Sequence, residues 1–152
     1  CSSCHLGMMG GADRRPLPFG IGGAQGTLNV PTIFNAALNF RQFWDGRALT
    51  LQEQALGPIE NPVEFGHDRD GAVAVLRTIP DYVIAFDRLY PDGITATNLS
   101  DAIAYYETMN FTGLSSPFLR QFDEEQNPLS AQARRGQRRF VEVGWPVRAH
   151  WS

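Results

Sequence analysis

The first five residues hold two cysteines and a histidine in the order Cys-x-x-Cys-His. Cys1 and Cys4 are the only cysteines among 152 residues, and His5 directly follows the second of them. This spacing is typical of c-type haem attachment, in which two thiols add to the vinyl groups along one porphyrin edge and the histidine binds the iron. The motif therefore predicts a covalent haem c, with His5 as the proximal iron ligand.

Other uses of the motif find less support in the sequence. A structural zinc site needs four ligands, and the only further histidines are His67 and His150. A thioredoxin-like redox pair would lie near a βαβ unit, and no such pattern is visible. An ordinary disulfide between Cys1 and Cys4 stays open.

Composition limits the classes of protein to which the chain can belong. Its residues are 43% apolar, which suffices for a buried core, and its length suits one domain with a fragment of another. The formal net charge of -3, without a basic run, argues against a nucleic-acid partner. No stretch approaches the roughly 20 apolar residues of a membrane span. Because the sequence starts at Cys1 without a Met or a charged leader, we expect a fragment of a longer protein.

The elements that must position the motif are predicted to be helices and loops. Residues 6–31 are rich in glycine and proline and predict a long ordered loop without a helix of its own. Thr50 followed by Glu53 is a capping-box pattern and predicts a helix from Leu51, which the segment 57–66 should break with Pro58 and Pro62. Alternating strand patterns are scarce, so the expected fold class is all-α.

Downstream of Pro58, apolar residues recur at helical spacing. In the segment 82–89, Tyr82, Phe86 and Leu89 are expected to form the apolar face of a helix. The other predicted helices cover residues 72–79, 99–106, 115–122 and the segment from Ser130 onward.

Five motifs, in this order along the chain, resemble the bacterial di-haem cytochrome c peroxidase family, which includes the MauG-like enzymes. They are "CSSCH" at 1–5, "NVPTIFN" at 29–35, "FWDGRA" at 43–48, "EQALGPI" at 53–59 and "NPVEFG" at 61–66. "LSAQARRGQRRFVEVG" at 129–144 is similar to the linker and first helix of the family's second haem domain.

The resemblance implies a fold and an activity. The expected fold is a cytochrome c-like haem domain at 1–127, followed at 128–152 by the start of a second cytochrome c domain that is cut short. Family members reduce hydrogen peroxide to water in the periplasm, with electrons from a small cytochrome c or a cupredoxin, and full-length members can be homodimers. The N-terminal domain, which this chain matches, holds the haem that reacts with peroxide.

The resemblance also assigns catalytic residues. Glu64 in "NPVEFG" matches the distal acid-base residue, which moves a proton between the two peroxide oxygens, and Gln54 in "EQALGPI" matches the distal glutamine. Trp44 matches a tryptophan that lies between the two haems and is thought to assist electron passage. Without the resemblance, Glu64 could be a solvated loop residue, Gln54 an exposed helix residue and Trp44 a core aromatic.

Four further residues complete the expected site. Phe43 is expected to contact the haem, and Asn29 matches a family calcium ligand, although a loop-capping amide is an equally simple interpretation. Asp45 and Arg47 are expected to form a structural ion pair or to contact a haem propionate.

The sequence departs from the family pattern at two places. Pro146 and Ala149 stand where the second domain would carry its cysteines, which predicts that no second covalent haem forms here. Ile21 stands where many members have a histidine that caps the peroxidatic haem at rest. The main alternative function is a mono-haem electron carrier with a methionine ligand, for which Met109 is the only methionine suitably placed. A haem-binding fragment without catalysis is the third.

Overall fold

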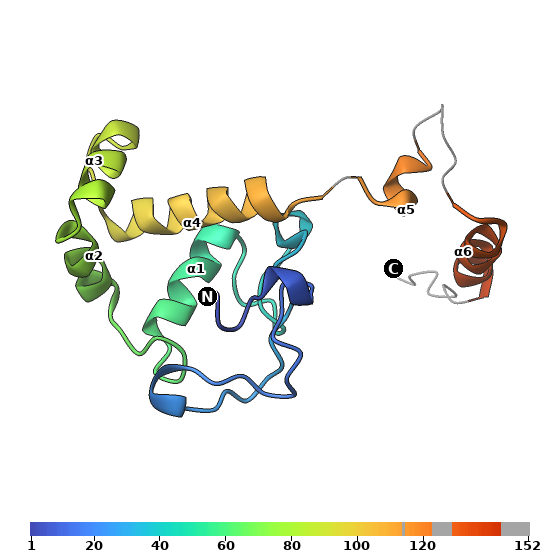
Figure 1. The fold of residues 1–152 in the computed structure, drawn as a ribbon, viewed down its shortest axis with the longest axis horizontal. Helices are drawn as coiled ribbons and strands as arrows, with labels where there is room; N and C mark the ends of the chain where they lie inside the picture. Colours follow the sequence, from blue (N-terminus) through green and yellow to red (C-terminus); the bar gives the residue numbers. More distant parts are fainter. Residues whose placement is uncertain (114, 123–128, 144–152) are drawn as a thin grey trace, which may run out of the picture. The chain divides into compact units, whose positions relative to one another are not determined.

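The computed structural model describes residues 1–113, 115–122 and 129–143 (Figure 1). The chain divides into two compact units, residues 1–112 and residues 113–152. The first unit contains η1 (Gly7–Met9), η2 (Ile21–Gly23), η3 (Ala36–Leu38), α1 (Leu51–Glu60), α2 (Arg69–Arg77), α3 (Pro80–Leu89) and α4 (Ala96–Phe111), where η denotes a 3-10 turn. The second contains α5 (Pro117–Arg120) and α6 (Ala131–Val143). The described residues form no β-strand beyond three isolated bridges, so the all-α prediction is confirmed.

The glycine-rich N-terminal segment is more regular than predicted. It contains the single turns η1 and η2, and its bridges pair Leu6 with Ala12 and Phe19 with Gln25. Gly22 and Gly23 adopt φ angles of 61° and 80°, which side-chain-bearing residues rarely adopt. These left-handed glycines allow the chain to turn tightly enough for the loop to bond to itself.

Helix α1 begins where the capping box predicts but does not end at Pro58. Thr50 Oγ1 accepts a hydrogen bond from the Glu53 N–H over 3.2 Å, and the Glu53 carboxylate accepts one from the Leu49 N–H. Pro58 lies inside the helix, which continues to Glu60, so the helix ends between the two prolines that were predicted to break it and not at the first of them. A proline costs a helix one main-chain hydrogen bond, here the bond to the Gln54 carbonyl, and the turn that follows stabilises the last carbonyls instead.

Helices α1 and α4 pack against each other and hold the centre of the first unit (Figure 1). One apolar cluster consists of Ala36, Leu51 and Ala104, from η3, α1 and α4. The partners are small, so the backbones of these elements approach closely at this point.

A second apolar cluster joins α2 and α3 to the start of α4. Its buried members are Val73, Phe86 and Ile94. The predicted apolar face of α3 is only partly correct, because Phe86 is buried whereas Tyr82 and Leu89 are 47% and 73% exposed. Val83 and Tyr90 pack beside Phe86 in their place. They lie three residues before and four residues after Phe86, and residues at these spacings share one side of a helix.

The second unit is described by its two helices alone. Ser116 Oγ accepts from the Leu119 N–H at the start of α5, and Ser130 Oγ accepts from the Ala133 N–H at the start of α6. Both bonds are ordinary serine N-caps. Among the described residues of both units, no helix has the length and apolar character needed to cross a bilayer.

Candidate functional site

The Cys-x-x-Cys-His segment forms one tight turn. The carbonyl oxygen of Cys1 accepts hydrogen bonds from the N–H of Cys4 at 3.0 Å and of His5 at 2.8 Å. His5 Nδ1 lies 3.0 Å from the carbonyl oxygen of Gly11. A carbonyl can only accept, so Nδ1 carries the proton in this contact and the Nε2 lone pair is left for a metal. Both thiols are free, so the structure does not pair Cys1 with Cys4.

The surroundings of this turn suit a porphyrin. Leu6, Met9, Phe19 and Ile21 are between 37% and 59% exposed, although each is a large apolar residue. No large side chain among the described residues is fully buried. Two free thiols, an imidazole nitrogen and a set of accessible apolar side chains fit the attachment, ligation and apolar contact that a haem c needs. The prediction that Cys1, Cys4 and His5 hold a haem is therefore compatible with their geometry.

The turn after α1 holds Glu64 in a defined position. Asn61 Nδ2 donates to Glu64 Oε1 over 2.7 Å, and the Asn61 carbonyl accepts from the Glu64 N–H over 3.0 Å. The Phe65 N–H donates to the carbonyl of Pro58, and the His67 N–H donates to that of Ile59. The turn is thus bonded onto the last carbonyls of α1, and the half-buried Glu64 is not a freely solvated loop residue.

Asn61, which the sequence analysis did not single out, holds the Glu64 side chain. Its side-chain oxygen accepts from the Val63 N–H over 3.2 Å while its amide group donates to the Glu64 carboxylate. The signal was available, because asparagine two residues before a free N–H often closes an Asx-turn, and here Pro62 pre-sets the backbone of that turn.

Gln54 lies on α1, half-buried, four residues before Pro58. Residues four apart in a helix lie on the same side. Gln54 therefore lies on the same side of α1 as Pro58, and the Asn61–Glu64 turn follows the end of this helix. No side-chain hydrogen bond is formed by Gln54 within the described ranges. Its amide is therefore available to a ligand.

Loop residues 18–26 contact both parts of the site. Cys4 Sγ lies 4.0 Å from the carbonyl oxygen of Phe19, and the Ile21 N–H donates to the carbonyl oxygen of Glu64 over 2.8 Å. In Figure 1 the turn η2 of this loop lies beside the segment that follows α1. The predicted attachment thiol and the backbone of the predicted acid-base residue therefore contact loop residues that are only two positions apart.

Phe43 and Trp44 occupy different environments. Phe43 has a φ of 67° and is half-buried, with the Arg47 guanidinium 3.4 Å from its ring centroid. A Cβ added at Gly57 of α1 would lie 2.8 Å from the Phe43 ring, so the aromatic ring packs directly on the helix backbone. Trp44 is 64% exposed and is not the core aromatic of the simpler interpretation.

Asp45 and Arg47 form the expected ion pair. One guanidinium nitrogen of Arg47 lies 2.9 and 3.0 Å from the two carboxylate oxygens of Asp45. Desolvation raises the pKa of Asp45, but hydrogen bonds from the Arg47 backbone and side chain, with its charge, outweigh that effect and leave the pKa below its ordinary value. Since Arg47 also stacks on Phe43, the pair fixes the ring in place.

Asn29 is bonded to Trp44 and to the loop that precedes it. The Trp44 Nε1–H donates to the Asn29 carbonyl over 2.7 Å, and Asn29 Nδ2 donates to the Arg15 carbonyl over 2.6 Å. The side-chain oxygen of Asn29 is left to accept a ligand. In the part of the chain that the structure describes, no three His, Cys, Asp or Glu side chains gather in a way that could hold a metal.

Other candidate iron ligands are placed elsewhere. His67 packs on Gly71 at the start of α2, with Nδ1 3.6 Å from Asp68, and His150 lies outside the described residues. Met109 is 62% exposed within α4, so the electron-carrier alternative gains no support from its position. Pro146 and Ala149 also lie outside the described residues.

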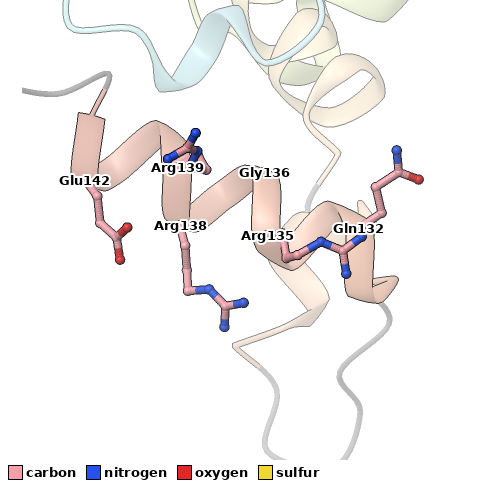
Figure 2. Close-up of a pocket in the computed structure, with 6 residues that line it drawn as sticks. All are labelled: Gln132, Arg135, Gly136, Arg138, Arg139 and Glu142. Atoms are coloured by element: carbon pink, nitrogen blue, oxygen red, sulfur yellow. The ribbon is translucent and has the colours of Figure 1, made fainter.

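A shallow hollow lies along one side of α6 (Figure 2). It is lined by Gln132, Arg135, Gly136, Arg138, Arg139 and Glu142. All six belong to one helix, and none is a predicted site residue.

The helical fold is that of a cytochrome c-like domain, and comparison with known proteins gives the family. A family model described as di-haem cytochrome c peroxidase matches residues 1–127, so the chain belongs to this family. The chain is 42% identical over 143 residues to cytochrome c peroxidase Ccp of Escherichia coli (strain K12), covering 93% of this chain and 30% of that protein.

Two further relatives agree. Cytochrome c551 peroxidase of Pseudomonas aeruginosa is 40% identical over 147 residues, covering 95% of this chain and 42% of that protein. The crystal structure of a MauG-like protein associated with microbial copper homeostasis superposes with a TM-score of 0.80 at 26% identity, covering 92% of this chain and 42% of that one. The predicted family and the cytochrome c-like fold are confirmed, and a haem c cofactor follows from the family. The chain spans less than half the length of each of these relatives.

Proposed function

We propose that this chain is the peroxidatic domain of a cytochrome c peroxidase, in which one haem c reduces hydrogen peroxide to water. The net reaction takes one peroxide, two electrons and two protons to two waters. The electrons come from a small cytochrome c or cupredoxin in the periplasm. Residues 1–127 are proposed as the haem domain and residues 128–152 as the linker and first helix of a second cytochrome c domain.

In this proposal the N-terminal turn holds the cofactor. Cys1 and Cys4 would form the thioethers, and His5 would bind the iron through Nε2 while its Nδ1–H is held by the Gly11 carbonyl. Phe43 contributes an apolar contact. Haem, when bound, supplies an iron centre that binds peroxide and exchanges electrons.

Glu64 and Gln54 act on the peroxide. The Glu64 carboxylate takes a proton from one peroxide oxygen and returns it to the other, so that the leaving oxygen departs as water. The Gln54 amide orients the peroxide by a hydrogen bond. Asn61 keeps one carboxylate oxygen of Glu64 occupied, which leaves the other oxygen to move the proton.

One observation carries this proposal: the 18–26 loop contacts Cys4 at Phe19 and Glu64 at Ile21. The proposed haem-attaching thiol and the backbone of the proposed acid-base residue are therefore connected through three consecutive loop residues, which supports their belonging to one site. The family match over 1–127 supports the same assignment.

Trp44 is proposed to assist the entry of electrons, and Asn29 is proposed to have a structural role. Trp44 is accessible on the surface, where an indole can relay electrons to a second redox centre. Asn29 is proposed as one calcium ligand through its side-chain oxygen, because its nitrogen and carbonyl are already bonded.

The proposal is tested on the full chain produced with c-type haem maturation. The pyridine spectrum of the reduced haem reports unreacted vinyl groups, so we expect two thioethers in the parent and one in Cys1→Ala. The ferric parent should then react with hydrogen peroxide in a stopped-flow experiment. A chain that loads haem by two thioethers but does not react with peroxide would exclude the peroxidase and leave the electron carrier.

A further inference from the structure

We propose that the 18–26 loop is a docked positioning element for Glu64 and that Gly20 is the residue that permits the docking. The inference rests on the proposed function, because it assumes that Glu64 moves the peroxide proton. It assigns a role to residues that have no part in the chemistry itself.

The loop is a small self-bonded unit. Gly26 N–H donates to the Pro18 carbonyl over 3.0 Å, and Gly20 N–H donates to the Ala24 carbonyl over 2.8 Å. The tip is closed by a bond from the Ala24 N–H to the Ile21 carbonyl, over 3.0 Å. A loop with this many internal bonds moves as one body, so a contact at its tip also fixes its base.

The tip is docked on the peptide that carries Glu64. Besides the hydrogen bond from Ile21 to the Glu64 carbonyl, Gly20 lies flat against the backbone of Val63 and Glu64. A Cβ added to Gly20 would overlap the Val63 carbonyl oxygen and would lie 2.8 Å from both the Cα and the carbonyl oxygen of Glu64. The Ile21 side chain also reaches Gly66, where a Cβ would lie 3.4 Å from its Cγ2.

The base of the loop is near the cofactor end of the site. Phe19, next to Gly20, places its carbonyl oxygen 4.0 Å from Cys4 Sγ. The loop therefore spans from the attachment thiol to the acid-base residue and sets the separation between them. Glu64 is bonded from the other side by Asn61, so its backbone is held between α1 and the loop.

Gly20→Ala should break this arrangement with one methyl group. The overlap is with backbone atoms, which cannot rotate away, so the loop must lift by about an ångström or the Glu64 peptide must move. A misplacement of about 1 Å can cost about 10²-fold in rate, because proton transfer depends steeply on geometry. Gly136→Ala is the matched control, since a Cβ there, in the middle of α6, meets no atom within 4 Å.

The experiment measures docking and chemistry separately on the haem-loaded chain. Docking is measured by hydrogen exchange of the Ile21 amide, which should be slow in the parent and in Gly136→Ala and about tenfold faster or more in Gly20→Ala. Chemistry is measured by the stopped-flow rate with hydrogen peroxide for the parent, Gly20→Ala, Glu64→Gln and the double variant. We expect Gly20→Ala to lose about 10²-fold and the double variant to react no more slowly than Glu64→Gln.

The double variant separates positioning from general damage. If the loop acts through Glu64, its loss has no further effect once the carboxylate is gone, whereas independent effects multiply. Fast exchange with an unchanged peroxide rate in Gly20→Ala would overturn the positioning role while leaving Glu64 as the acid-base residue. A slow parent-like exchange in Gly20→Ala would overturn the docking. An unchanged rate in Glu64→Gln would overturn the acid-base role itself and this inference with it.

A second variant covers failure of Gly20→Ala to fold. Ile21→Pro leaves Gly20 unchanged, removes the N–H that donates to the Glu64 carbonyl and places a ring carbon against that oxygen, so it undoes the docking at the hydrogen bond instead of at Gly20. Like Gly20→Ala, it should lower the rate of the reaction with peroxide, and it should have no further effect on that rate when combined with Glu64→Gln. An unchanged rate would contradict the role of the hydrogen bond.

Discussion

The backbone N–H of Ile21 donates to the carbonyl oxygen of Glu64 over 2.8 Å. The residue at which many relatives are expected to carry a capping histidine is thus bonded to the residue expected to move the peroxide proton. The Ile21 side chain itself is 59% exposed and can be exchanged without disturbing a core. Because isoleucine cannot bind iron, the ferric haem of this chain should be high-spin and should react with peroxide without prior reduction.

Ile21→His should restore a gated resting state. The imidazole would extend from a loop that contacts both Cys4 and Glu64, which is near enough to the site to supply a second axial nitrogen. We expect a change from high-spin to low-spin in electron paramagnetic resonance, and peroxide reactivity only after reduction. A high-spin signal in Ile21→His would contradict the placement of residue 21 at the open side of the iron.

Asn61→Ala should slow the peroxide reaction by about 10- to 10²-fold without loss of haem. The substitution removes the 2.7 Å hydrogen bond to the Glu64 carboxylate and the Asx-turn bond from the Val63 N–H, and leaves the bonds between main-chain groups of the turn in place. Stopped-flow rates give the effect. Asn110→Ala is the control, because the Asn110 amide bonds only the Tyr106 carbonyl within α4, and its rate should match that of the parent. Equal rates for all three proteins would remove Asn61 from the site.

Gly57→Ala should destabilise the chain, although alanine usually favours a helix by up to about 1 kcal/mol over glycine. The new Cβ would meet the Phe43 ring at 2.8 Å, and the ring is held from the other side by Arg47. Overpacking of this kind costs about 1–3 kcal/mol. The midpoint of thermal unfolding should therefore fall in Gly57→Ala, whereas it should rise or stay unchanged in Gly136→Ala. A raised midpoint for Gly57→Ala would show that Phe43 yields freely.

Glu107 should make stability depend on pH. Burial raises the pKa of Glu107 above its ordinary 4.5, so the folded chain holds this proton more tightly than the unfolded chain does. Its stabilising contribution is full below the ordinary pKa and is lost as the pH rises through the raised one. Glu107→Gln should raise the unfolding midpoint at pH 7, and that gain should vanish near about pH 4. A gain of equal size at both pH values would argue against a buried ionisable carboxylate.

The control for this pH series is Glu142→Gln. Glu142 is an exposed residue of α6, and its substitution should leave the midpoint unchanged at each pH.

Local signals in the sequence predicted most helix positions correctly. The Thr50–Glu53 pattern gave the start of α1, and apolar spacing located α2, α3 and α4. The same reasoning failed at Pro58, because proline chemistry predicts the loss of one bond but not the turn at Asn61–His67 that compensates for it. On α3 the spacing fitted more than one face, and only packing against α2 and α4 selects Phe86 over Leu89.

The sequence predicts candidate residues for the site but not the contacts that hold them. The Cys-x-x-Cys-His motif and the family motifs predict Cys4 and Glu64 as site residues, whereas their connection through Phe19 and Ile21 depends on how the 18–26 loop folds. Gly20 is an example. In the sequence it is one of several glycines in this segment, and only its close approach to Val63 in the structure distinguishes it from Gly22.

The most direct test of the central claim is the reaction of the haem-loaded Glu64→Gln chain with hydrogen peroxide. Glutamine keeps the size of the side chain and can still bond Asn61, but it cannot take and return a proton. With Glu64 as the acid-base residue, the stopped-flow rate should fall by about 10²–10⁴-fold while the haem content and spectrum stay those of the parent. A variant that reacts as fast as the parent would contradict the account.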